Sequence, residues 1–144
     1  MKTLTLPERA ARTGKVLERY RMRPFSWNGA SCIHLARAQA IAMGHRVPQL
    51  GTIRSAIGAK RALRDQGHET VQDLLDSLFP RVTPLAMLIG DVCTLRGEDD
   101  EDTGLAAICI ADGQGNLFGW HAQDPSQLRT IKFGLADVDG AWRL

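Results

Sequence analysis

Residues 25–45 have the sequence FSWNGASCIHLARAQAIAMGH, a turn followed by a predicted helix. An Asn-Gly turn signal comes first, and Ser31 then stands where a helix N-cap is favoured. Cys32 begins a predicted helix that ends near Met43, with Gly44 as its C-terminal stop. The many alanines of this segment suit close packing against a neighbouring element. The stretch therefore predicts a helix that packs closely on a neighbour and carries a cysteine at its N-terminus.

A first helix is predicted upstream of this stretch. Thr5 and Glu8 have the spacing of a capping box, so the helix is expected to run from Thr5 to about Arg21. Its apolar side is predicted to consist of Leu6, Ala10, Leu17 and Tyr20.

Downstream, a third helix is predicted over about residues 52–66, with an apolar side of Ile53, Ile57 and Leu63, and a fourth follows Thr70. Five short apolar stretches separated by Gly, Asp and Asn then predict an antiparallel sheet: AMLIGDVCTLR, GLAAICIAD, NLFGWHA, LRTIKF and GAWRL. The order predicts one α+β domain over residues 1–144, with helices in about 1–80 and the sheet in about 81–144.

Composition excludes several classes of function. The formal net charge of +2 is too small to indicate a nucleic-acid partner, and no apolar run approaches the roughly 20 residues that span a bilayer. The three cysteines lack metal-ligand spacing, so neither a metal site, a disulfide framework nor a cofactor is expected. A basic side on the third helix (Arg54, Lys60, Arg61 and Arg64) and the acidic run at 97–102 are interpreted as a solvated helix face and a solvated loop.

Cys32 is the candidate catalytic residue. At a helix N-terminus, the unpaired N–H groups and the helix dipole favour the thiolate, which is the nucleophilic form. Catalysis also needs a general base within hydrogen-bond reach. Of the four histidines, His121 is the one on a predicted strand that can face the cysteine. The alternative interpretation is that Cys32 is a small buried side chain at a tight helix contact.

The ordered motifs resemble the NlpC-type, papain-like peptidases, and more narrowly an uncharacterised NlpC-like family from phages and prophages found beside tail genes. The residues that carry the resemblance are Phe25, Trp27, Cys32, Ala36, Ser55–Gly67, the Gly90-Asp91 pair, Phe118–Ala122 and Ala141–Leu144. The resemblance covers nearly the whole chain. It implies a papain-like fold in which the cysteine helix packs on the antiparallel sheet.

The sequence departs from this family at the catalytic positions. Active members carry Asp before the nucleophile, where this chain has Ser31. Their histidine stands at the start of the second strand, and that position falls here on Gly104 or Leu105. His121 matches the third polar residue of the family. The resemblance therefore implies that Cys32 and His121 are vestiges of a catalytic set without its base.

These departures predict a structural or interaction protein rather than an enzyme. The expected setting is the tail tip or baseplate of a phage or prophage virion, assembled in the host cytoplasm, with hub, distal tail or fibre proteins as partners. The alternative is an active cysteine peptidase or amidase that cleaves peptidoglycan during phage entry, with Cys32 attacking and His121 assisting. Both keep peptidoglycan as a further partner and neither involves a cofactor.

Overall fold

The computed structural model describes residues 3–49, 51–99, 103–121, 124–132 and 134–144. Four helices come first in the chain: α1 (Leu6–Tyr20), α2 (Cys32–Ala42), α3 (Ala56–Asp65) and α4 (Val71–Leu78). All four were predicted, but α3 begins later than expected. The Ser55 hydroxyl accepts from the Gly58 N–H and caps the helix there. Ile53 is consequently buried in the preceding loop, and Ile57 on α3 is exposed.

The second half of the chain forms one antiparallel sheet. Its strands are β1 (Arg81–Val82), β2 (Val92–Asp99), β3 (Ala106–Ala111), β4 (Asn116–His121), β5 (Asp124–Lys132) and β6 (Val138–Trp142), in the spatial order β1-β6-β2-β3-β4-β5. Short 3-10 turns, η1 (Pro84–Ala86) and η2 (Leu135–Asp137), precede β2 and β6. Helices followed by an antiparallel sheet confirm the predicted α+β fold class.

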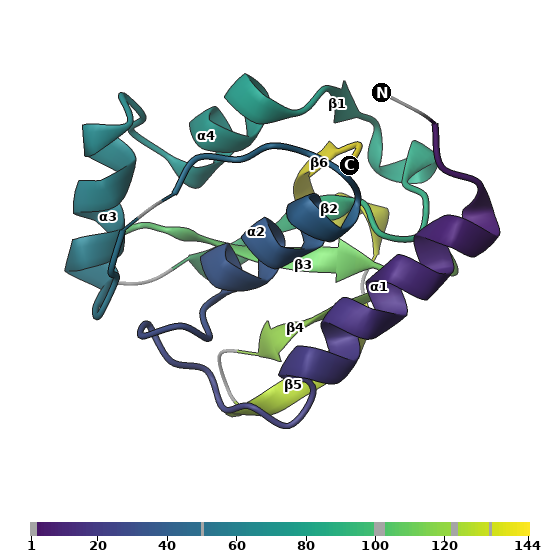
Figure 1. The fold of residues 1–144 in the computed structure, drawn as a ribbon, viewed down its shortest axis with the longest axis horizontal. Coiled ribbons are helices and arrows are strands. Elements are labelled where there is room, and N and C mark those ends of the chain that lie inside the picture. The colour runs from purple at the N-terminus through teal and green to yellow at the C-terminus, as the bar shows by residue number, and fades with distance from the viewer. Residues whose placement is uncertain (1–2, 50, 100–102, 122–123, 133) are drawn as a thin grey trace.

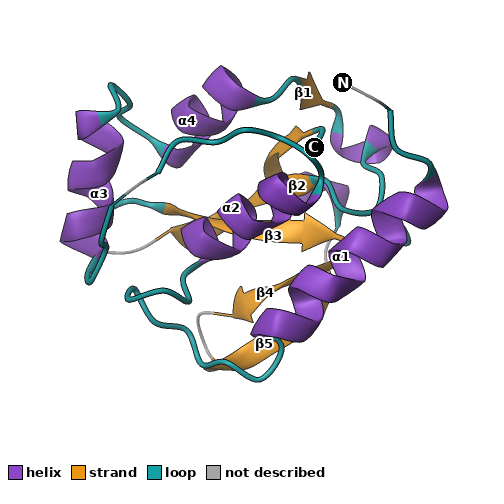
Figure 2. Ribbon diagram, in the orientation of Figure 1, coloured by secondary structure: helices purple, strands orange, loops and turns teal. Residues whose placement is uncertain are grey.

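The helices lie on one face of this sheet, with α1 and α2 in front of it and α3 and α4 to one side (Figures 1 and 2). Alternate residues of β3, Ala106, Ile108 and Ile110, join the core beneath the helices, as the alternation of side chains along a strand requires. Cys93 on β2 and Cys109 on β3 are register partners and belong to a second apolar cluster. Both faces of the central strands are thereby buried.

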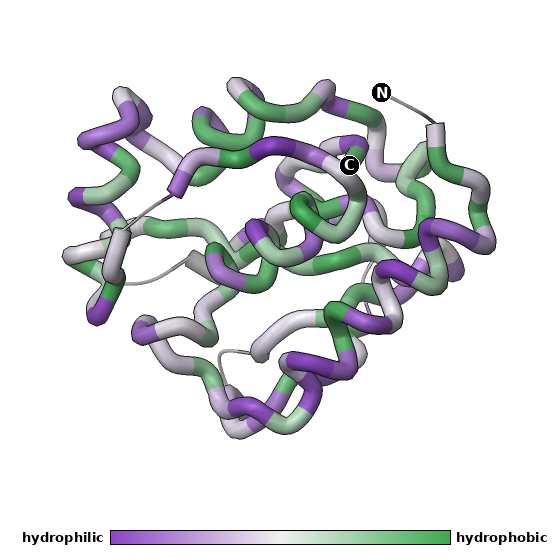
Figure 3. The backbone as a smooth tube through the Cα atoms, viewed as in Figure 1, coloured by the Kyte–Doolittle hydropathy of each residue, from purple (hydrophilic) through white to green (hydrophobic). Residues whose placement is uncertain are grey.

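The predicted apolar side of α1 was half right, since Leu17 and Tyr20 pack on the core but Leu6 and Ala10 are exposed. The helix buries Arg9, Thr13, Val16 and Tyr20, whereas Leu6 is 56% exposed. Figure 3 shows hydrophilic and hydrophobic residues alternating along this helix. The buried side of α1 is rotated from the predicted one because Arg9 faces the interior. There the Arg9 guanidinium has hydrogen-bond partners, which offset the free-energy cost of removing it from water.

Those partners form a buried polar network around Asp91, which is fully buried. Arg9 Nη2 lies 2.6 Å from Asp91 Oδ1, and Arg143 Nε lies 2.8 Å from Asp91 Oδ2. The Leu88 and Leu144 amides donate to the same carboxylate. Arg9 also donates to the Leu144 carbonyl at 2.6 Å. Asp91 thus joins α1, the turn before β2 and the residues after β6.

Gly90, beside Asp91, meets α1 and α2 at close range. Its φ is +91°, and a Cβ there would lie 2.7 Å from Thr13 Oγ1 and 3.0 Å from Gln39 Nε2. Gln39 Nε2 donates to the Gly90 carbonyl and to Thr13. The Gly90-Asp91 pair is therefore the point at which both N-terminal helices are fastened to the sheet.

Two strand predictions need correction. The segment from Ala86 to Gly90 is a 3-10 turn and a tight turn rather than a strand, because Asp91 accepts from the Leu88 N–H and closes the turn. The acidic run was predicted to be a loop, but β2 continues through Asp99, which pairs with Ala106 after a shift in register. Residues 100–102 of that run lie outside the described residues.

Candidate functional site around Cys32

An aromatic cluster holds the loop that leads into Cys32. Phe25 makes edge contacts with Trp27 and Trp120, at 5.2 and 5.8 Å between ring centroids, and Trp120 contacts Tyr20 at 6.2 Å. The Trp120 indole N–H donates to the Arg23 carbonyl at 2.9 Å. Such contacts join the end of α1, the loop and β4. The loop therefore reaches the start of α2 in a defined position.

Ser31 caps α2 with an unusual partner. Its Oγ accepts from the His34 N–H, and the Ser31 N–H donates to His34 Nδ1 at 3.3 Å. Ser31 Oγ also lies 2.7 Å from the same ring nitrogen. His34 thus takes the place that Glu or Gln occupies in an ordinary capping box. This helix start confirms the predicted N-cap and fixes where Cys32 stands.

Removing this cap is expected to cost stability. Ser31→Ala should lower the free energy of unfolding by about 1–2 kcal/mol, because N-cap substitutions cost about that much and the half-buried His34 loses the hydroxyl partner of its Nδ1. The measurement is urea denaturation followed by tryptophan fluorescence. Ser55→Ala, at the exposed cap of α3, is the matched control and should cost less. An equal or smaller loss for Ser31→Ala contradicts this account of the cap.

The Cys32 thiol is half-buried and meets the backbone of β3. Its Sγ lies 4.0 Å from the Ala106 carbonyl oxygen, which only the protonated thiol can use as an acceptor. Burial raises the pKa of Cys32, and the N–H groups of Ile108, Cys32 and Ile33 offset this in part. The N–H groups at the helix N-terminus therefore lower the pKa of Cys32, but desolvation of the sulfur raises it by more. The resting state is a neutral thiol.

The start of β3 beside this thiol is apolar. Leu105 and Ala106 are 5% and 3% exposed, and both belong to the core beneath the helices. The described pairing of β3 with β4 involves Ile110 and Ala111. Figure 1 shows the two strands diverging toward the N-terminal end of α2. Of the residues that the structure describes there, Leu105 and Ala106 beside Cys32 have no side-chain group that accepts a proton.

Three of the four histidines are engaged in contacts of their own. His34 is held by Ser31, the His45 ring packs against Phe79 at 4.9 Å, and His68 Nε2 lies 3.5 Å from Ser77 Oγ. The backbone of His121 ends β4 and pairs with Asp124. The His121 side chain lies outside what the structure describes, so its part in a site with Cys32 stays a prediction.

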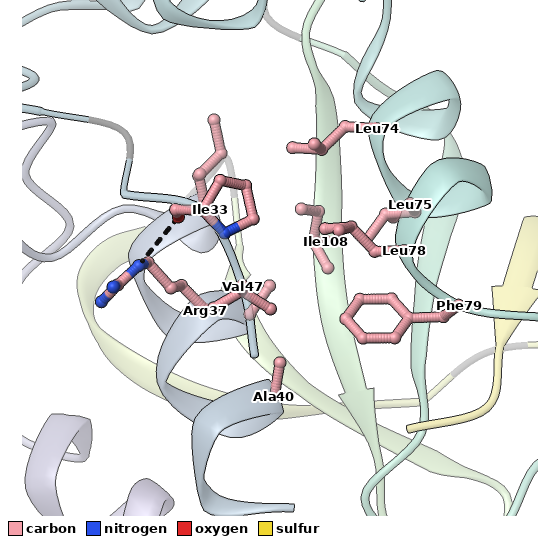
Figure 4. A pocket seen from close by; sticks show the side chains of 11 residues that line it. Ile33, Arg37, Ala40, Val47, Leu74, Leu75, Leu78, Phe79 and Ile108 are labelled. Carbon is pink, nitrogen blue, oxygen red and sulfur yellow. Dashed lines mark hydrogen bonds between the residues drawn. The ribbon is translucent and has the colours of Figure 1, made fainter. Parts of the chain in front are cut away.

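A small apolar pocket of about 40 Å³ lies between α2, α4 and β3 (Figure 4). Ile33 and Ala40 on α2, Ile108 on β3 and side chains of α4 face it, and Arg37 at its rim donates to the Pro48 carbonyl at 3.3 Å. Cys32 does not line it. The pocket and the thiol are therefore separate features.

The described residues contain no cluster of three His, Cys, Asp or Glu side chains arranged to hold a metal ion. None of the helices in the described part of the chain is long and apolar enough to cross a membrane. Sequence reasoning missed Arg9 as the partner of Asp91, because a charge at a helix position is ordinarily taken as exposed.

Comparison with known proteins gives a family and a fold. The model of a family described as a domain of unknown function, DUF6950, matches residues 5–144. No curated protein sequence matches the chain.

Among solved structures, the peptidoglycan hydrolase RipB from Mycobacterium tuberculosis is similar over 99% of this chain and 68% of its own, with a TM-score of 0.54 and 12% identity. A mutated form of the resuscitation promoting factor interacting protein RipA is similar over 99% of this chain and 65% of its own, with a TM-score of 0.53 and 15% identity. The chain thus spans about two thirds of these structures. The likeness shows an NlpC/P60-type, papain-like fold.

Proposed function

The chain belongs to the DUF6950 family, and we propose that it is a non-catalytic module of the NlpC/P60 type whose role is to bind other proteins. The observation that carries this proposal is the state of Cys32. Its Sγ faces a carbonyl oxygen, the strand start beside it is apolar, and burial raises its pKa. General-base assistance contributes about 10²–10⁴ in rate, and no described side chain contacts the sulfur as a base.

The setting proposed for this module is a phage or prophage tail. This part rests on the resemblance of the sequence motifs to NlpC-like proteins found beside tail genes. The module would assemble in the host cytoplasm into the tail tip or baseplate, against hub, distal tail or fibre proteins. Purification from a tail-producing host tests it directly. Co-purification with tail proteins supports the setting, and a persistently solitary protein argues against it.

The enzymatic alternative is tested by incubating the purified protein with peptidoglycan and analysing the soluble products by mass spectrometry. We expect the wild-type protein and Cys32→Ala to release the same background of fragments. His121→Ala serves as a second variant, since His121 is the histidine assigned to assist. Release of muropeptides that is lost in both variants would replace the binding role with a cysteine peptidase or amidase.

A further inference from the structure

A groove between α1 and α2 is distinct from the apolar pocket of Figure 4, although Arg37 lies at the edge of both, and Cys32 does not line it. It has a volume of about 130 Å³ and is lined by Arg19, Tyr20, His34, Arg37, Ala38 and Ile41. The two helices lie side by side over this length (Figure 1). All of its lining residues come from α1 and α2, and none comes from the sheet.

Positive charge gathers along this groove. The charged side chains that line it are Arg19 and Arg37, and both are cationic at neutral pH. On α1, Arg12 donates to the Ala42 carbonyl of α2 at 3.0 Å, so this side of α1 faces α2. Lys15 and Arg19 follow at i+3 and i+7 and continue the same row. Glu18, the acidic residue of this part of α1, lies near Arg21 instead.

His34 adds an oriented donor to the groove. Because its Nδ1 accepts from the Ser31 N–H, the ring hydrogen sits on Nε2. Burial lowers the pKa of His34, and the charge of Arg37 lowers it further, so the ring is neutral at pH 7. Arg19 is likewise held in place, since it donates to the Tyr20 hydroxyl and stacks over the Tyr20 ring at 5.1 Å. These donors are arranged before any ligand arrives.

The groove also offers apolar surface beside the donors. Ile41 is 48% exposed although it stands on a helix whose other aliphatic side chains are mostly buried. Ala38 and Tyr20 lie next to it in the lining. Cations with an adjoining apolar side chain suit a ligand that carries a carboxylate next to an aliphatic group.

We infer that the α1/α2 groove binds an acidic segment of a partner protein, with a Glu or Asp carboxylate between Arg19, Arg37 and His34 and an aliphatic neighbour on Ile41. The inference rests on the proposed function in taking a protein as the occupant. The geometry of the groove does not depend on whether Cys32 reacts. Arginine suits this role because its planar fork donates two hydrogen bonds to one carboxylate.

The test uses a fluorescein-labelled peptide of alternating Glu and Leu, with binding to the full chain followed by fluorescence anisotropy. A matched peptide with Gln in place of Glu and a single-stranded DNA oligonucleotide are the other arms. We expect saturable binding of the Glu peptide and much weaker binding of the Gln peptide. The double variant Arg19→Gln/Arg37→Gln should weaken the Glu peptide by about tenfold or more, and Ile41→Ser should weaken it by a smaller factor.

The control removes the same charge elsewhere. Arg61→Gln/Arg64→Gln alters the exposed basic side of α3 and should leave the affinity within about twofold, once thermal melting shows that all variants are folded. If both double variants lose the same affinity for the Glu peptide, the effect comes from net charge alone and the proposed site is wrong. Tighter binding of DNA than of the Glu peptide, or no saturable binding, overturns it as well. The peptidoglycan assay with Cys32→Ala is independent of these outcomes.

Discussion

Asp91→Ala is expected to lower the free energy of unfolding by about 3–5 kcal/mol, a large fraction of the stability of an ordinary domain. The substitution leaves the Arg9 guanidinium, only 4% exposed, without its carboxylate inside the protein. It also removes the acceptor of the Leu88 and Leu144 amides. Urea denaturation followed by tryptophan fluorescence measures the loss, with circular dichroism to detect a partly unfolded native state.

The matched control for this prediction is Asp139→Ala. Asp139 is 38% exposed and lies 3.7 Å from Arg96, so its loss should cost at most about 1 kcal/mol. If Asp91→Ala lowers the free energy of unfolding as little as Asp139→Ala does, the Asp91 network contributes little to stability. The double variant Arg9→Met/Asp91→Leu, which removes both charges, should recover part of the stability lost in Asp91→Ala.

Trp142→Ala is expected to cost a similar amount, about 3–5 kcal/mol. The side chain is fully buried, and its indole N–H donates to Asp76 at 2.8 Å, which links β6 to α4. The ring lies over Gly140 on the same strand, where a Cβ would come within 2.6 Å of it. Denaturation by urea at constant pH measures the loss.

Trp142→Phe separates packing from hydrogen bonding. It keeps most of the buried ring and loses the donor to Asp76, so it should cost less than half as much as Trp142→Ala. The Arg81 guanidinium, 4.9 Å from the Trp142 ring, keeps its bidentate contact with Asp76 in both variants. Equal costs for the two substitutions would place the stabilisation in the hydrogen bond rather than in the buried ring.

The helix boundaries were largely predictable because they are encoded locally. Thr5, Ser31 and Thr70 cap their helices as their positions in the sequence predict. The turn at Asp112 is held just as locally, since its Oδ1 accepts from the Gln114 and Asn116 amides. Boundaries of this kind depend on a few neighbouring residues and need no knowledge of the fold.

The buried polar contacts were not predictable from pattern. Arg9 and Asp91 are 82 positions apart, and each is unremarkable within its own segment. Only the tertiary arrangement shows that the Gly90-Asp91 pair and Ala141–Leu144, two motifs of the family resemblance, meet at one place. The direction of the pKa shift of Cys32 was not predictable for the same reason. A helix N-terminus predicts a lowered pKa, and the β3 backbone that buries the sulfur comes from 74 positions away.

The most direct test of the non-catalytic role is the pH dependence of Cys32 alkylation by iodoacetamide, followed on the native protein by peptide mass spectrometry so that each cysteine is read separately. A half-buried thiol with a raised pKa predicts slow modification at pH 7, with a rate that still rises with pH above the ordinary cysteine pKa of about 8.5 instead of levelling off there. A rate that is already at its plateau below pH 7, and that falls on His121→Ala, would reveal an activated thiolate and contradict the account.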